Sequence, residues 1–110
     1  MRAFTIDALL AEQDESRRRY LEFLRVPSLS LGVYRLRVGE ADPQQPHGED
    51  EVYHVIAGRS RFTSGGETVE VAPGTLLFVE RGVEHRFTEI AEDLTILVFF
   101  APAEGAMPPP

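Results

Sequence analysis

The chain has 110 residues, a length that suits one domain with a modest hydrophobic core. Its formal net charge of −7 argues against a nucleic-acid partner, because such partners bind to basic patches. The sequence contains no cysteine, which excludes disulfides, thiolate metal sites and a cysteine nucleophile.

The distribution of apolar residues predicts a cytoplasmic protein without a membrane partner. The longest apolar run, residues 96–101, is far shorter than the roughly 20 residues that span a bilayer. No apolar stretch typical of a secretion signal follows the first residues, because acidic side chains arrive early, at Asp7, Glu12, Asp14 and Glu15.

The N-terminal segment predicts a short helix and a connector. Residues 5–12 fit a helix in which Thr5 serves as the N-terminal cap, and Leu9 and Leu10 are expected to dock on the body of the domain. Residues 14–19 are charged, and we expect them to connect this helix to the rest of the chain.

The rest of the chain predicts short strands separated by glycine and proline. The expected strands are residues 20–26, 28–38, 51–57, 59–63, 67–72, 76–80, 84–90 and 94–101. The first of these also fits a helical stripe. Ser64-Gly65-Gly66 predicts a hairpin turn, and the loop at residues 39–47 carries two prolines.

Eight short strands with little helix predict an all-β sandwich or barrel. We expect three parts: residues 1–19 as the N-terminal helix and connector, residues 20–102 as the barrel, and residues 103–110 as a flexible tail that ends in three prolines.

Two segments about thirty residues apart contain side chains that can bind a metal. The first holds His47 and Glu51, which point the same way if the segment is extended, because alternate strand residues share a face. The second holds His85. Two imidazoles and one carboxylate, with open positions left over, are typical of a catalytic divalent metal.

The spacing around these residues resembles the motifs of the cupin superfamily. The first family motif, G-x5-H-x-H-x3,4-E-x6-G, corresponds here to Gly39-x5-Gln45-x-His47-x3-Glu51-x6-Gly58. The second, G-x5-P-x-G-x2-H-x3-N, corresponds to a segment in which two of the family residues are replaced by glutamate, Gly74-x5-Glu80-x-Gly82-x2-His85-x3-Glu89. The resemblance covers about residues 32 to 101.

The resemblance implies a double-stranded β-helix, the cupin jelly-roll barrel, preceded by the short helix. It assigns metal ligation to His47, Glu51 and His85. Gln45 replaces the first family histidine and offers a carbonyl oxygen as a weaker fourth ligand, with Gln44 as the substitute if the loop slips by one residue. The expected cofactor is one divalent ion, Fe²⁺, Mn²⁺, Ni²⁺ or Zn²⁺.

Other polar residues near these motifs have two interpretations each. Tyr53 shares the face of Glu51, where it either hydrogen-bonds a substrate or fills the core with its hydroxyl satisfied. His54 faces the opposite side and is expected to pack or to lie in an interface. Arg35 and Arg37 share a strand face that either receives an anionic substrate or is solvated.

The function implied by the resemblance is that of a small metal-binding cupin, with dioxygenase-like or isomerase-like chemistry on a small organic molecule. The alternative is a non-catalytic cupin that binds a small ligand or is purely structural; loss of the first histidine favours it. Residues 76–79 and 96–100 are apolar on both strand faces, so we expect a homodimer.

Overall fold

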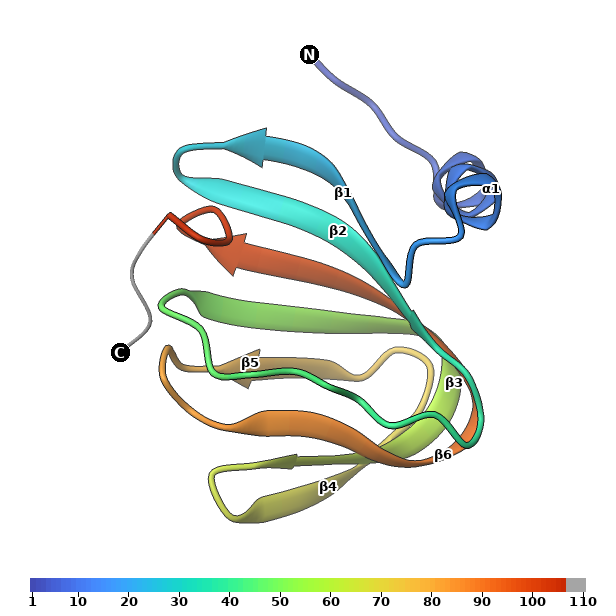
Figure 1. Ribbon diagram of the computed structural model, residues 1–110, viewed down its shortest axis with the longest axis vertical. Coiled ribbons are helices and arrows are strands. Elements are labelled where there is room, and N and C mark those ends of the chain that lie inside the picture. The colour runs from blue at the N-terminus through green and yellow to red at the C-terminus, as the bar shows by residue number, and fades with distance from the viewer. Residues whose placement is uncertain (107–110) are drawn as a thin grey trace.

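The computed structural model describes residues 1–106, which form an antiparallel β domain with one N-terminal helix (Figure 1). This confirms the expected all-β class. The elements are α1 (Ile6–Ser16), β1 (Tyr20–Val26), β2 (Leu29–Leu36), β3 (Asp50–Ser64), β4 (Glu67–Val71), β5 (Leu76–Val79) and β6 (His85–Ala101).

The strands follow the order β1-β2-β6-β3-β4, with β5 paired to β3, and every pairing is antiparallel. The two long strands β3 and β6 pair along most of their length and form the spine of the domain. Figure 1 shows both strands curling so that the sheet folds over on itself. The interior of this curl contains the hydrophobic core and the polar site described below.

The prediction of eight strands is wrong, because the described residues contain six. Residues 51–57 and 59–63 are parts of β3, and residues 84–90 and 94–101 are parts of β6. Gly58 has a φ of 99°, and the register between β3 and β6 shifts on either side of it. Such bulges bend a strand without ending its hydrogen bonding, so a sequence signal for a break marks a bend instead.

The helix is longer than predicted and takes in part of the expected connector. Thr5 caps it as expected, since its hydroxyl accepts a hydrogen bond from the Ala8 amide at 3.3 Å. The helix ends at Ser16, and Arg17 takes a left-handed conformation as its C-terminal cap. The buried Gln13 extends the docked face, because its amide donates to the carbonyl oxygens of Arg19 and Val33.

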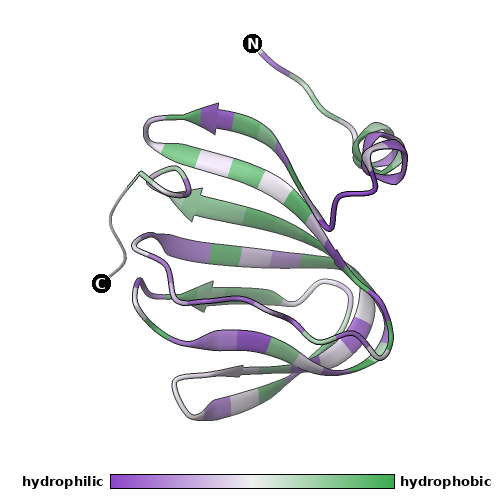
Figure 2. Ribbon diagram, viewed as in Figure 1, coloured by the Kyte–Doolittle hydropathy of each residue, from purple (hydrophilic) through white to green (hydrophobic). Residues whose placement is uncertain are grey.

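The core is built from residues of β2, β3 and β6 whose side chains alternate between buried and exposed faces. Hydrophobic and hydrophilic bands accordingly alternate along several strands in Figure 2. The hairpin between β3 and β4 confirms the predicted turn, since Gly65 and Gly66 both have positive φ angles. These two conformations suit glycine and match the twist of the flanking strands.

The start of the expected C-terminal tail contacts the sheet. Ala103 is buried, and the amide of Glu104 donates to the hydroxyl of Ser30 at 2.9 Å. Arg25 donates to the carbonyl oxygen of Glu104 at 2.7 Å. Residues 107–110 of the expected tail lie outside the described residues. Within residues 1–106, no helix is long and apolar enough to cross a membrane.

Candidate metal centre

The three expected ligands come from separate parts of the fold. His47 lies in the loop before β3, Glu51 is the second residue of β3, and His85 is the first residue of β6. In the ladder between β3 and β6, Glu51 pairs with Phe100 and Ser64 pairs with His85. A straight strand would separate Glu51 from Ser64 by about 43 Å, so the curl of β3 and β6 brings the ligands together.

The structure places the donor atoms of these ligands within reach of a single ion. The Nε2 atom of His85 lies 3.0 Å from Oε1 of Glu51, and Nε2 of His47 lies 3.5 Å from the same oxygen. All three donor atoms lie within 4.8 Å of one another. Donors that share one ion at about 2.0–2.2 Å stand about 3–4 Å apart. The two distances from Glu51 to the imidazoles fall in this range and fit a metal.

The burial of these donor atoms is the second observation that fits a metal. Both carboxylate oxygens of Glu51 and the Nε2 atoms of His47 and His85 are buried, and none makes a hydrogen bond within the described residues. The 3.0 Å contact of His85 with Glu51 therefore lacks hydrogen-bond alignment. Buried polar atoms without partners are costly. A divalent cation would satisfy all four atoms at once.

The imidazole of His85 is oriented for ligation by its other nitrogen. Its Nδ1 lies 2.9 Å from the carbonyl oxygen of Val83 and donates a proton to it, which leaves the lone pair of Nε2 free in the neutral ring. Burial lowers the pKa of His85, but the Glu51 carboxylate and the Val83 carbonyl outweigh it, so the pKa lies above its ordinary value. The surroundings therefore favour positive charge at this point.

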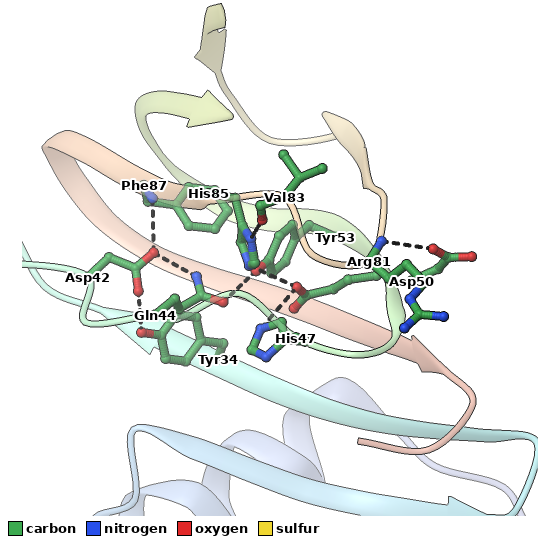
Figure 3. A network of polar contacts seen from close by, with 11 residues as sticks. Tyr34, Asp42, Gln44, His47, Asp50, Tyr53, Arg81, Val83, His85 and Phe87 are labelled. Atoms are coloured by element: carbon green, nitrogen blue, oxygen red, sulfur yellow. Dashed lines mark hydrogen bonds and ion pairs between the residues drawn. The ribbon is translucent and has the colours of Figure 1, made fainter. Parts of the chain in front are cut away.

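A polar network that the sequence analysis missed ties the loop before β3 to strands β2 and β6 (Figure 3). Asp42 is buried and accepts hydrogen bonds from the Tyr34 hydroxyl at 2.7 Å, from the Gln44 amide at 2.6 Å and from the Phe87 backbone amide at 2.9 Å. An Asp beside a proline ordinarily indicates a surface turn, so no sequence signal pointed to this buried role.

The loop presents Gln44 rather than Gln45 to the interior. Gln45 is exposed, whereas Gln44 lines the cavity beside the ligands and accepts a hydrogen bond from the Tyr53 hydroxyl at 2.5 Å. Tyr53 is fully buried, and its contact with a substrate stays a prediction. His54 is half-buried on the opposite strand face from Glu51, as expected.

A cavity of about 160 Å³ opens beside the ligands. Its walls are aromatic and apolar with a few polar groups, and the lining residues are Tyr20, Tyr34, Pro43, Gln44, His47, Glu51, Val98, Phe100 and Glu104. The buried hydroxyl of Tyr20 has no hydrogen-bond partner among the described residues. Its phenol ring lies over Gly32, where an added Cβ would come within 2.2 Å of the ring.

All three tyrosines of the chain have raised pKa values, chiefly because burial disfavours the phenolate. Carboxylates nearby, including Asp42 at Tyr34 and Glu51 at Tyr53, raise them further. The unfolded chain ionises its tyrosines first, near pH 10, so the free energy of unfolding is expected to fall as the pH rises above about 10. Near-ultraviolet absorbance during an alkaline titration checks this.

In that titration, phenolate should appear only together with the loss of the folded circular dichroism signal. The same protein in guanidinium provides the control, in which all three tyrosines titrate near their ordinary pKa. A Gly32→Ala variant should push the Tyr20 ring out of the cavity and make one tyrosine titrate before unfolding. Three tyrosines that ionise normally in the folded wild type would contradict their burial.

Comparisons with known proteins agree with this geometry. A family model described as a cupin domain, Cupin_2, matches residues 32–100. The Uncharacterized protein SCO3923 of Streptomyces coelicolor is 47% identical over 105 residues, which cover 96% of this chain and 100% of that protein.

Two solved structures have the same fold. TT1209 from Thermus thermophilus superimposes with a TM-score of 0.78 at 25% identity, over 94% of this chain and 99% of that one. An RmlC-like cupin family protein with a double-stranded β-helix fold from Methanocaldococcus jannaschii gives a TM-score of 0.68 at 18% identity, over 76% and 78% of the chains. With a family match over residues 32–100 and a fold shared with known cupins, this chain belongs to the cupin family.

Proposed function

We propose that the protein binds one divalent metal ion, Fe²⁺, Mn²⁺, Ni²⁺ or Zn²⁺, through His47, Glu51 and His85, and acts on a small organic molecule held in the adjoining cavity. The observation that carries the proposal is the convergence of four buried donor atoms without hydrogen-bond partners in residues 1–106. A bound ion would supply Lewis-acid or dioxygen chemistry, as expected for a dioxygenase-like or isomerase-like centre.

The cavity limits what such a substrate can be. A volume of about 160 Å³ admits a small molecule, and the rings of Tyr20, Tyr34 and Phe100 favour one with an apolar or planar part. The Tyr20 hydroxyl, which has no partner in the described part of the chain, offers a hydrogen bond to its polar end. These features support a small organic substrate rather than a polymer.

Glu104 is the carboxyl group, besides Glu51, that lines this cavity among the described residues. Burial raises the pKa of Glu104, and the carboxylates of Glu51 and Glu22 raise it further. A carboxyl group with a raised pKa holds its proton more readily than an exposed glutamate does, which suits it to proton exchange. Glu104 is therefore the group we propose to exchange a proton with a bound substrate.

Elemental analysis of the untagged protein as purified tests the metal. We expect close to one equivalent of a transition metal per chain, or uptake of one equivalent on reconstitution with Fe²⁺, Mn²⁺, Ni²⁺ or Zn²⁺. A protein that takes up none of the four ions would refute the metal site. Stoichiometric metal with small-molecule binding but no turnover would favour the alternative, a non-catalytic ligand-binding cupin.

A homodimer is part of the same proposal and is supported by an apolar outer face. Phe78 of β5 pairs with Val52 of β3, which pairs with Phe99 of β6, so these three side chains form one row. Leu76 and Phe78 are 68% and 64% exposed. Large apolar side chains that are this exposed commonly mark an interface. A cytoplasmic location stays a prediction.

Light scattering after size exclusion is expected to give twice the chain mass of 12.3 kDa for the wild type. Phe78→Glu should yield monomers, because a carboxylate in an apolar interface loses its hydration. Val69→Glu, which places the same charge at an exposed apolar position of β4, serves as the matched control and should remain dimeric. A monomeric wild type would contradict the dimer.

A further inference from the structure

A second cavity, an open groove of about 680 Å³, lies between the end of α1 and strand β2. It is lined by five arginines, two carboxylates and one amide: Arg17, Arg18, Arg19, Arg35, Arg37, Asp14, Glu40 and Gln13. We call it the arginine groove. It shares no lining residue with the cavity at the metal centre.

The charge of the arginine groove is opposite to that of the chain. Five of the eleven basic residues line it against two carboxylates, although the whole chain carries a net charge of −7. Asp14 pairs with Arg35, and Glu40 pairs with Arg19 at 2.7 Å. Within residues 1–106, the other three guanidinium groups of the groove make no hydrogen bond or ion pair; they belong to Arg17, Arg18 and Arg37.

The position of these arginines is not explained by the helix alone. Positive side chains are favoured at the C-terminal end of a helix, which accounts for Arg17 and Arg18. Arg35 and Arg37 belong to β2 and its end, and no helix end accounts for them. The two carboxylates of the groove neutralise two of its five positive charges. The remaining three repel one another unless a further negative charge lies between them.

The floor of the arginine groove is fixed. The side-chain amide of Gln13, which is 2% exposed, donates to the carbonyl oxygens of Arg19 at 2.9 Å and Val33 at 3.0 Å. These two bonds tie α1 to the beginning of β1 and to β2. The backbone segments that carry the arginines are therefore fixed relative to each other, which lowers part of the entropy cost of binding a ligand between them.

We propose that the arginine groove binds a small, multiply charged oxyanion, a molecule that carries phosphate groups or several carboxylates. The planar guanidinium fork matches the oxygens of both groups in a bidentate manner. A long polyanion is disfavoured, because the chain as a whole carries a net charge of −7 and would repel a polymer that extends beyond the groove. The groove is thus a binding site for an anionic small molecule, separate from the metal centre.

Isothermal titration calorimetry with pyrophosphate and with citrate tests this at constant ionic strength. Both probes chelate metals, so metal-free protein is used. We expect saturable binding of one anion per chain, and the probe that binds more tightly distinguishes phosphate from carboxylate ligands. The variant R17Q/R18Q/R37Q should bind the preferred probe at least about tenfold more weakly, since it loses several charged hydrogen bonds.

The matched control is R2Q/R81Q/R86Q, which removes three exposed arginines outside the groove whose side chains make no ion pair in residues 1–106. Its net charge equals that of the groove variant, and its affinity should stay within about twofold of the wild type, because diffuse surface charges contribute little at constant ionic strength. Equal weakening in both variants would show diffuse attraction and overturn the proposal, as would the absence of saturable binding. Circular dichroism confirms that both fold.

The test is independent of the metal centre. A Glu51→Gln variant, which keeps the size of a buried side chain, should bind the preferred anion as tightly as the wild type. An anion held by His47 and His85 in the metal-free protein would bind this variant more tightly, because a negative charge beside it is removed, and that result would overturn a separate site.

Discussion

Replacing Glu51 with glutamine is expected to abolish stoichiometric metal binding while the domain stays folded. The substitution keeps the size of a side chain that is 1% exposed, but it removes the negative charge that both imidazoles face. A neutral amide oxygen is a weaker ligand for a transition metal than a carboxylate. The two histidines alone would then hold the ion only weakly.

The thermal shift caused by metal measures this effect. At a free metal concentration of one hundred times the Kd, binding stabilises the folded wild type by about 2.7 kcal/mol, which raises the Tm of a domain this size by roughly 10–20 °C. At the same concentration, Glu51→Gln should show almost no shift. Glu104→Gln makes the same chemical change elsewhere in the cavity and should keep the shift. Equal shifts in both variants would contradict ligation by Glu51.

Replacing Gly58 with alanine is expected to destabilise the folded state by about 3 kcal/mol. Gly58 has a φ of 99°, in the region that residues with a side chain rarely adopt. A Cβ at this position would lie 2.4 Å from the carbonyl oxygen of Asp93 and 2.8 Å from Cα of Leu94. Both are backbone atoms of β6, so neither can rotate away.

Gly74→Ala is the matched control for this prediction. Its φ of 93° is close to that of Gly58, but nothing in residues 1–106 lies within 4 Å of its added Cβ. The backbone strain is therefore similar and the contact is absent, so a cost of about 1 kcal/mol is expected. Urea unfolding of the two variants measures the difference. The same cost at both glycines would contradict a close approach of β3 and β6.

Local features of the fold were predictable from the sequence because they depend on neighbouring residues. β1 was predicted with its observed bounds, and the Thr5 cap and the Gly65-Gly66 turn are confirmed. The cluster of three candidate metal ligands was predictable for a different reason, because the spacing of these residues resembles that of a known family. The structure then brought His47, Glu51 and His85 together.

Features that depend on the curl of the sheet were not predictable. A bulge and a chain break give the same sequence signal, so β3 and β6 were each divided in two. The placement of Gln44 instead of Gln45 follows from the contact of Gln44 with Asp42, which sits in a loop whose course no periodicity describes. Tyr20 enters the cavity only because Gly32, on the neighbouring strand, leaves room for its ring.

The walls of the cavity have a consequence for how such proteins diversify. Tyr20 and Glu104 line it, yet they lie on either side of residues 32–100, the segment shared across the family. The three proposed metal ligands and two of the residues that line the adjoining cavity are thus encoded in separate stretches of the chain. Changes in β1 or in the segment after β6 would alter the wall of the cavity and leave the three proposed ligands unchanged. Two related proteins with the same proposed ligands can therefore differ in the molecule that the cavity accepts.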